Sequence, residues 1–276
     1  MLTVMNDGFV AKKSLGQHFL NSPTVPRWLA DAAEIAPGES VLEIGPGTGA
    51  LTAELLSRGA NVLALEADER AIAVLTERFK KELGEGRLRL DHHDVRELDL
   101  AKIGLSDHSF KVVSNIPYYL TGQLFRVLLS GPIQPRVLVF LVQKEVGKRA
   151  TAKRERGDKE SLLSLSIKVF GDTSYEKTVG KGHFTPPPKV DSAIISVKNI
   201  GRDRFKTLDQ DLFFKLLHLS FASKRKQLIG NLSQEYERTR LMRVFERLPL
   251  RPDVRAEDLT LEEWLRLATE IDGLRP

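Results

Sequence analysis

Residues 45–49, Gly-Pro-Gly-Thr-Gly, form a glycine-rich turn between an apolar run at 41–44 and an amphipathic segment. Glycine lets the backbone of such a turn approach a ligand closely, beside the N-terminus of the following helix. Glu66 lies 21 positions after Gly45, at the end of the next apolar run, where a carboxylate can bind two ribose hydroxyls. This spacing is typical of a site for a nucleoside-containing cofactor.

The acidic residues around the turn indicate which cofactor it binds. Gly45, Gly47 and Ala50 also satisfy the dinucleotide pattern G-x-G-x-x-[GA], so the turn alone fits NAD as well. Glu43, however, suits the cationic aminoacyl end of S-adenosylmethionine better than an anionic pyrophosphate. Asp94 ends a third predicted strand, where its carboxylate can accept from the amino group of the cofactor's adenine. We therefore expect S-adenosylmethionine, with a turn that binds nothing as the alternative.

A metal site is a second interpretation of the run His92-His93-Asp94. Adjacent residues of a strand point to opposite faces, so the two histidines cannot easily share one ion. The chain also has no cysteine, which excludes disulfides, thiolate nucleophiles and Cys-ligated zinc. We expect no bound metal, with both histidines either solvated or beside the cofactor-binding residues.

The reaction is indicated by a run that follows a further predicted strand, Asn115-Ile116-Pro117-Tyr118. An adenine N6 has its lone pair delocalised into the ring, so it must acquire sp³ character before it attacks a methylsulfonium carbon. The side-chain oxygen of Asn115 and the carbonyl of Ile116 can accept the two N6 hydrogens, while Pro117 rigidifies the turn. Tyr118 offers an aromatic face for a base that has left its stack. A capped turn with core tyrosines is the alternative, but the position one strand beyond Asp94 favours catalysis.

A second aromatic residue, Phe184, precedes the proline run at 186–188. A loop stiffened by prolines can present this ring to the face of the target base opposite Tyr118. The alternative is a packed loop residue, which is the commoner role of a phenylalanine before prolines. The predicted catalytic residues are therefore Asn115, Pro117, Tyr118 and Phe184.

Short apolar runs that alternate with amphipathic segments between residues 40 and 149 must position these side chains. Such alternation predicts parallel βαβ units and a doubly wound α/β sheet, in which ligands bind at the carboxyl ends of the strands. The predicted strands are 41–44, 62–65, 88–90, 111–113, 137–141 and 190–197. The predicted helices in this part are 22–35, 49–57, 68–83 and 121–129.

Beyond residue 202 the pattern changes to helices alone. The predicted helices there are 209–221, 224–232, 236–248 and 261–271. We predict two domains: an α/β domain of residues 1–201 that includes an N-terminal arm, and a small helical domain of residues 202–276.

The chain is basic, with a formal net charge of +5 and a pI of about 9.3, which favours a polyanionic partner. Basic residues gather in three parts of the sequence: Lys12 and Lys13, then Lys144, Lys148, Arg149, Lys153, Arg154 and Arg156, and then Lys224, Arg225 and Lys226. A solvated face is the alternative interpretation of each cluster.

Together these features resemble the small-subunit ribosomal RNA adenine-N6 dimethyltransferase family of the KsgA/RsmA type. The matching segments are 16–20, 43–49, Glu66, Asp94, 115–118, 143–146, 184–192, 221–232 and 255–257, so they cover nearly the whole chain. The resemblance implies a class I S-adenosylmethionine methyltransferase fold, which is Rossmann-like with a seven-stranded, mostly parallel sheet. It also implies a small all-helical C-terminal domain.

The resemblance further implies the substrate. Members transfer methyl groups from S-adenosylmethionine to N6 of two adjacent adenosines in the loop of the 3′-terminal helix of 16S rRNA, within the maturing 30S subunit, giving dimethyladenosines. The cofactor-binding residues expected on this basis are Gln17, His18, Leu20, Gly45, Gly47, Glu66, Asp94 and Asn115. We assign RNA binding to Lys224, Arg225, Lys226, Arg149 and Arg154.

Other functions share parts of this pattern. A sister family dimethylates large-subunit rRNA, and mitochondrial relatives act in transcription, but residues 221–228 and 255–259 resemble the small-subunit branch. A non-catalytic assembly factor would not need Asn115, Pro117 and Tyr118. An NAD-dependent oxidoreductase would need a proton donor in its substrate domain, and the sequence has none in a plausible motif.

The location of the protein follows from what the sequence lacks. No apolar run is long enough to span a bilayer, and the N-terminus has no secretory-signal pattern. We therefore expect a cytoplasmic protein that acts away from membranes, and we expect it to be a monomer.

Overall fold

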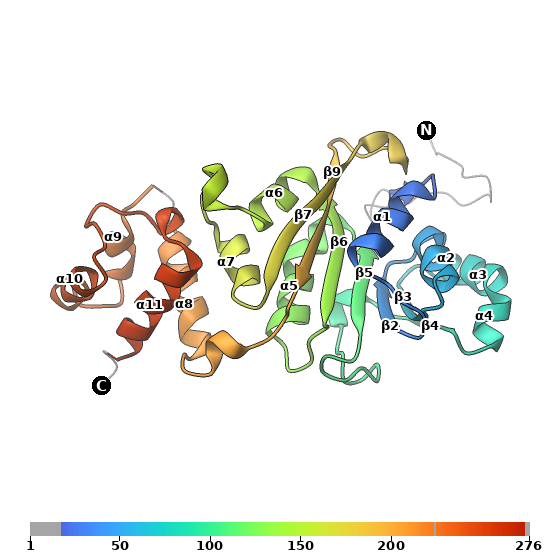
Figure 1. Cartoon of the computed structure of the whole chain (residues 1–276), viewed down its shortest axis with the longest axis horizontal. Helices are drawn as coiled ribbons and strands as arrows, with labels where there is room; N and C mark the ends of the chain where they lie inside the picture. Colours follow the sequence, from blue (N-terminus) through green and yellow to red (C-terminus); the bar gives the residue numbers. More distant parts are fainter. Residues whose placement is uncertain (1–17, 224, 274–276) are drawn as a thin grey trace. The chain divides into compact units, whose positions relative to one another are not determined.

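The structure is a computed structural model that describes residues 18–223 and 225–273 (Figure 1). Its internal contacts divide the chain into two units. The α/β unit contains residues 18–148 and 172–200, and the helical unit contains residues 149–171, 201–223 and 225–273. The second boundary, at 200–201, lies next to the predicted one, but the helical unit also includes 149–171, which the prediction assigned to the α/β domain.

Within the described residues, a seven-stranded sheet in the order β4-β3-β2-β5-β6-β9-β7 forms the centre of the α/β unit (Figure 1). All neighbours from β4 to β6 pair in parallel, whereas β9 is antiparallel to both β6 and β7. The strands are β2 (Ser40–Ile44), β3 (Asn61–Glu66), β4 (Leu88–His92), β5 (Lys111–Asn115), β6 (Val137–Gln143), β7 (Asp172–Val179) and β9 (Ser192–Lys198). The predicted mostly parallel, seven-stranded sheet is confirmed.

Burial on both faces explains why the central strands are continuous apolar runs. Residues 138–142 of β6 have no exposed surface, and residues 111–114 of β5 are buried as well, although Lys111 and Ser114 are polar. The edge strand β7 instead has mainly exposed or half-buried residues, with Glu176 and Lys177 exposed, which is typical of an edge that resists pairing with another chain. This polar composition explains why β7 was not predicted.

Helices flank the sheet, and most match the predicted segments. They are α1 (Thr24–Ala32), α2 (Ala50–Ser57), α3 (Glu69–Arg78), α4 (Lys80–Gly84), α5 (Thr121–Ser130) and α6 (Lys144–Ala150). Asp68 caps α3 by accepting from the main-chain N–H of Arg70, as its position predicted. The predicted helix 68–83 is interrupted at Phe79, which leaves helical geometry with φ −112° and ψ 29°.

Two further two-residue strands, β1 (Phe19–Leu20) and β8 (Phe184–Thr185), pair antiparallel. They join the chain before α1 to the proline loop, although 164 to 166 positions separate the paired residues. Strands of two residues have no periodicity, so the sequence alone did not indicate them.

The helical unit consists of α7 (Leu162–Lys168), α8 (Gln210–Phe221), α9 (Leu228–Leu232), α10 (Arg238–Arg247) and α11 (Leu261–Asp272). Residues 149–171 belong here because α7 packs on α8 and the ring of Phe170 stacks on that of Phe214, with a centroid distance of 6.0 Å. The prediction of a helix from residue 224 is wrong at its start. Arg225 and Lys226 lie in a turn, and α9 begins only at Leu228.

Short 3₁₀ segments complete the description: η2 (Val95–Glu97), η3 (Tyr118–Leu120), η4 (Arg154–Arg156), η5 (Lys181–His183), η6 (Asp203–Phe205) and η7 (Ala256–Asp258). None of the helices in the described ranges has the length and apolar character needed to cross a bilayer.

Candidate functional site

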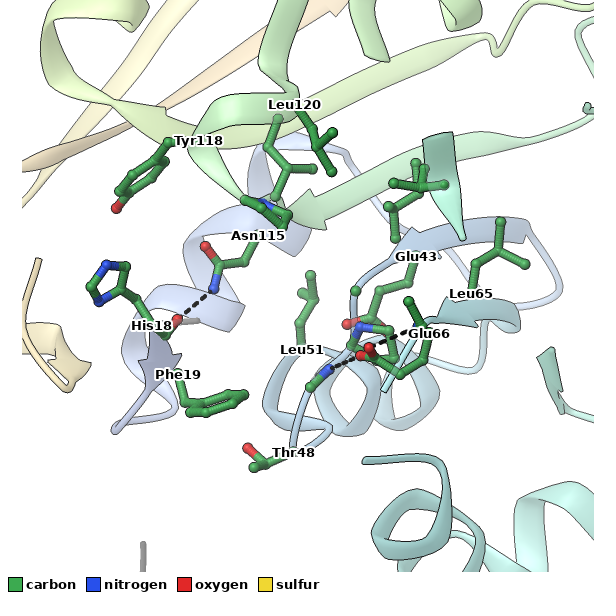
Figure 2. Close-up of a pocket in the computed structure, with 18 of the residues that line it drawn as sticks. His18, Phe19, Glu43, Thr48, Leu51, Leu65, Glu66, Asn115, Tyr118 and Leu120 are labelled. Carbon is green, nitrogen blue, oxygen red and sulfur yellow. Dashed lines mark hydrogen bonds between the residues drawn. The ribbon is translucent and has the colours of Figure 1, made fainter. Parts of the chain in front are cut away.

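A pocket lies at the carboxyl ends of four adjacent parallel strands, β4, β3, β2 and β5 (Figure 2). Such an edge is where open α/β sheets bind ligands. Each strand contributes a residue that the sequence predicted for the site: Asp94 after β4, Glu66 at the end of β3, Gly45 after β2 and Asn115 at the end of β5.

The turn between β2 and α2 requires glycine because its backbone has positive φ and because neighbouring rings leave no room for a Cβ at two of its positions. Gly45, Gly47 and Gly49 all have positive φ, of 67°, 59° and 82°. A Cβ on Gly47 would lie 2.8 Å from the ring of Phe19, and one on Gly49 would lie 2.5 Å from the ring of Phe79. A Cβ on Gly45 would meet nothing within 4 Å, so this backbone faces open space in the pocket.

Glu66 connects the end of β3 to the glycine turn. Its Oε2 accepts from the N–H of Gly47 at 3.0 Å, and its Oε1 accepts from the N–H groups of Ala67 and Asp68 at 2.9 and 3.0 Å. Burial raises the pKa of this carboxyl, although the three N–H groups oppose that effect. Because a carboxylate offers about four acceptor positions, the three contacts fix its orientation and leave capacity for a ligand hydroxyl.

Glu43 is the most deeply buried acid of the pocket, with 1% of its surface exposed. Its Oε2 accepts from the hydroxyl of Thr52 on α2 at 2.7 Å. Burial raises the pKa of Glu43 to about 8, and the nearby Glu66 contributes to the shift. The pocket without a ligand therefore disfavours loss of the Glu43 proton.

Asp94 lies in the pocket wall, two residues beyond β4. Its pKa is lowered, whereas that of Glu43 is raised. Arg96 donates to both of its oxygens, with Nε at 3.0 and 2.9 Å, and the main-chain N–H of Arg96 donates at 2.9 Å. These hydrogen bonds lower the pKa of Asp94 to about 2. It is a stable anion at the pocket rim.

Asn115 is held by the chain segment before α1. Its Nδ2 donates to the main-chain carbonyl of His18 at 3.2 Å, and Figure 2 shows its oxygen on the side of Tyr118. Pro117 follows at φ −57° and ψ 127° and leads into the 3₁₀ turn η3. The donor end of the amide is thus used within the protein, while the acceptor end faces the part of the pocket where Tyr118 lies.

Tyr118 is positioned from two sides. Its hydroxyl forms a hydrogen bond of 2.7 Å with Ser192 Oγ at the start of β9, and burial raises its pKa. The ring of His18 stacks on it with a centroid distance of 6.0 Å and an interplanar angle of 25° (Figure 2). His18 Nδ1 in turn lies 2.8 Å from the carbonyl of Pro186, so the proline loop orients this pair.

The structure does not bring Phe184 to the pocket. Its side chain is 2% exposed and belongs to the hydrophobic core cluster that includes Val25 and Leu29 of α1. Its backbone pairs with Leu20 in the β1–β8 ladder. The ring stacked nearest Tyr118 is that of His18, so the geometry supports the packed-loop alternative for Phe184 rather than the stacking role.

The remaining predicted residues lie as follows. His18 and Leu20 line the pocket, as does Gly47, whereas Gln17 lies outside the described residues. The structure adds Arg96 and Tyr119 to the pocket wall, and Tyr119 is 63% exposed. An aromatic residue directly after the Asn-Ile-Pro-Tyr run was the available signal for Tyr119. The part of the chain that the structure describes contains no group of three or more metal-binding side chains.

The predicted RNA-binding residues belong to the helical unit. Arg149, Arg154, Arg225 and Lys226 are exposed, Arg154 pairs with Glu263 at 3.4 Å, and Lys224 lies outside the described residues. Asn231, which is fully buried in α9, shapes the turn that carries Arg225 and Lys226. Its Nδ2 donates to the carbonyls of Ser220 and Ser223 at 2.6 and 3.3 Å, just at and beyond the end of α8.

Comparison with known proteins identifies the family of the chain. The model of the family described as ribosomal RNA adenine dimethylase matches residues 8–273. The chain is 38% identical over 273 residues to ribosomal RNA small subunit methyltransferase A of Dehalococcoides mccartyi strain CBDB1, covering 98% of this chain and 92% of that protein.

Solved structures show the same architecture. A dimethyladenosine transferase from Plasmodium falciparum superimposes with a TM-score of 0.75 at 25% identity, covering 93% of this chain and 98% of that one. The 23S rRNA methyltransferase ErmE superimposes with a TM-score of 0.70 at 24% identity, covering 92% and 99%, and so shares the fold. These findings confirm the predicted family, fold and enzyme class. The chain belongs to the ribosomal RNA adenine dimethylase family of S-adenosylmethionine-dependent methyltransferases.

Proposed function

We propose that this enzyme dimethylates N6 of two adjacent adenosines in the 3′-terminal helix loop of small-subunit rRNA, during maturation of the 30S subunit. The observation that carries the proposal is the fixed amide of Asn115, whose nitrogen is bound to the His18 carbonyl and whose oxygen lies towards Tyr118 in the pocket. The name of the Dehalococcoides relative supports the small-subunit assignment.

The residues of the pocket fit S-adenosylmethionine better than a dinucleotide. Three carboxyl groups line it, from Glu43, Glu66 and Asp94, and the cation Arg96 is paired with one of them. These carboxyl groups offer an anionic pyrophosphate no attraction, whereas the ammonium and sulfonium charges of S-adenosylmethionine favour the ionised forms of Glu43 and Glu66 and are attracted to them. When bound, S-adenosylmethionine supplies an electrophilic methyl group. Gly45, Glu66 and Asp94 would hold it, with Glu43 next to its cationic part.

The chain's own residues then prepare the adenine. Asn115 Oδ1 and the carbonyl of Ile116 accept the N6 hydrogens, which favours sp³ geometry and directs the lone pair away from the ring. Tyr118, fixed by Ser192 and His18, stacks on the flipped base. No general base is required before transfer, because the proton can leave the positively charged product nitrogen afterwards.

Basic residues between positions 149 and 226 contribute RNA contacts outside the pocket. We assign them to Arg149, Arg154, Lys224, Arg225 and Lys226. We assign these residues to phosphate contacts, which contribute affinity and orientation but carry no sequence information. With this function we propose that the protein is a cytoplasmic monomer that acts on the maturing subunit.

Methylation of isolated subunits tests the proposal. Small subunits from a strain that lacks this modification would be incubated with the protein and labelled S-adenosylmethionine, and the modified bases would be mapped. We expect label on two neighbouring adenosines of the 3′-terminal loop. Label on other bases of the small-subunit rRNA, or none, would contradict the proposal. Thermal stabilisation by S-adenosylhomocysteine but not by NAD tests the cofactor separately.

A further inference from the structure

A second groove of the α/β unit, lined by residues other than those of the cofactor pocket, is rich in lysine. Its lining residues are Lys144, Lys148, Lys181, Lys189, Glu145, Val190 and Asp191. Four ammonium groups therefore face two carboxyl groups. The lysines come from α6, η5 and the loop before β9, so the fold brings together charges that are up to 45 positions apart.

Close packing of α6 on the sheet builds one wall of this groove. A Cβ on Gly147 would lie 2.8 Å from Ala193 Cβ and 3.2 Å from Ile195 Cγ2 of β9, so a glycine is needed for this approach. Lys144 and Lys148 are four residues apart and therefore lie on one face of the helix. The packing fixes the direction in which both lysines extend.

Asp191 ties the walls of the groove together. Its main-chain carbonyl accepts from the N–H of Lys144 at 3.0 Å, its Oδ1 accepts from the N–H of Lys181 at 3.2 Å, and its Oδ2 lies 3.4 Å from Lys144 Nζ. The carboxylate thus neutralises Lys144. Within the described part of the chain, Lys148, Lys181 and Lys189 are exposed and form no ion pair, so three positive charges face solvent.

The groove adjoins the residues that hold the target base. Ser192, the next residue after Asp191, forms the hydrogen bond to the Tyr118 hydroxyl at 2.7 Å. An RNA strand whose adenosine stacks on Tyr118 must continue past this point on either side. Lysine binds phosphate as a point charge, and the groove contains no aromatic side chain on which a base could stack.

We propose that Lys148, Lys181 and Lys189 bind backbone phosphates of the rRNA strand beside the adenosine in the pocket. This inference rests on the proposed function for the identity of the ligand. It assigns to the catalytic unit itself an RNA site that would keep the unpaired strand in place while the base is flipped. The basic turn of the helical unit is a separate site, in the other unit of the chain.

The test compares two triple variants that remove the same charge. Lys148→Ala, Lys181→Ala and Lys189→Ala are combined, while Lys144 is kept because it holds Asp191. The control combines Lys80→Ala, Lys81→Ala and Lys102→Ala, three exposed lysines on other surfaces of the same unit. Binding of unmethylated small subunits is measured over a salt series, together with the KM for subunits and the affinity for S-adenosylhomocysteine.

The groove variant should show a higher KM for subunits. The salt slope, which is the slope of log binding constant against log salt concentration, should be smaller in magnitude by about two to three, roughly 0.7–0.9 for each lost phosphate contact. The affinity of this variant for S-adenosylhomocysteine should equal that of the wild type, and a Lys→Arg version should recover the slope. Equal salt slopes for the groove and control variants would overturn the proposal that these lysines bind RNA. A loss of cofactor affinity as large as the loss of subunit affinity would also overturn it. A wild-type protein that fails to methylate the subunits would instead overturn the proposed function.

Discussion

The carboxamide of Asn115 donates through Nδ2 to the main-chain carbonyl of His18, which lies 97 positions earlier in the chain, at 3.2 Å. A free asparagine amide could turn either end towards a substrate. Here the segment before α1 holds the nitrogen, so the oxygen is left as the acceptor in the pocket. The same residue, His18, stacks its ring on Tyr118, so one short segment orients both side chains expected to contact the adenine.

Asn115→Ala should reduce the rate of methyl transfer about a hundredfold or more, as expected when a preorganised polar group is lost from the transition state. Single-turnover kinetics with unmethylated subunits would measure the effect. Affinity for S-adenosylhomocysteine serves as the control and should fall much less than the rate. Turnover near that of the wild type would remove Asn115 from the catalytic role.

The raised pKa of Glu43 predicts how stability depends on pH. Burial raises this pKa from 4.5 to about 8, so the folded protein binds more protons than the unfolded chain within that window. The contribution of Glu43 to the free energy of unfolding therefore falls as pH rises from about 4.5 to 8. Glu43→Gln should remove this part of the pH dependence and be more stable than the wild type at pH 8, measured by urea denaturation. If the free energy of unfolding depended on pH in the same way for both proteins, the prediction would be contradicted.

A cationic cofactor should also change the protonation of Glu43. Its charge favours the carboxylate, so binding of S-adenosylmethionine below pH 8 should release protons. Calorimetry in buffers of different ionisation enthalpy would measure the release, which should disappear in Glu43→Gln. Equal proton release by the two proteins would show that Glu43 keeps its proton when the cofactor binds.

Glu66→Ala should weaken cofactor binding by about 1–3 kcal/mol, because a charge-assisted contact to the ribose is lost. The change also removes the acceptor of the Gly47 N–H, which loosens the glycine turn. Titration calorimetry with S-adenosylhomocysteine measures the loss. Glu69→Ala is a matched control, since Glu69 is an exposed acid three residues further on in α3. An affinity for Glu66→Ala that equals the control would exclude Glu66 from the site.

The sequence predicted those parts of the fold and site that depend on local pattern. The apolar run at 137–141 was predicted as a strand, and burial on both faces of β6 is the reason why its residues are apolar without interruption. The glycine turn, Glu43 and Glu66 were predictable because a strand, a turn and a helix follow one another directly. The cap at Asp68 was predictable from its side chain for the same reason.

Features that join distant segments were not predictable. Nothing in the sequence near His18 indicates that its ring will stack on Tyr118 or that its carbonyl will hold Asn115. The environment of Phe184 was also not predictable, because a ring beside prolines can face either the pocket or the core. Pairing of β1 with β8 decides the choice, since it packs Phe184 with the core cluster. The turn at Arg225 likewise depends on the buried Asn231.

The basic residues 224–226 should contribute affinity for RNA without affecting cofactor binding. Changing Lys224, Arg225 and Lys226 to Ala should weaken subunit binding and lower the salt slope by roughly one unit for each lost contact. Binding of subunits and of RNA with unrelated sequence should weaken alike, since phosphates carry no sequence information. If subunit binding stayed normal over the salt series, these residues would be solvent-exposed charges that do not contact RNA.

The final product should be dimethyladenosine, with the monomethyl form as a transient intermediate. After the first transfer N6 keeps one hydrogen, which either Asn115 Oδ1 or the Ile116 carbonyl can still accept. Pro117 and Tyr118 frame the base edge without closing over it, because Tyr118 is held back by Ser192 at 2.7 Å and Tyr119 is 63% exposed. A time course of digested RNA, followed by mass spectrometry, measures both forms. Monomethyladenosine that persists with excess cofactor and long incubation would show that the pocket excludes the second methyl group.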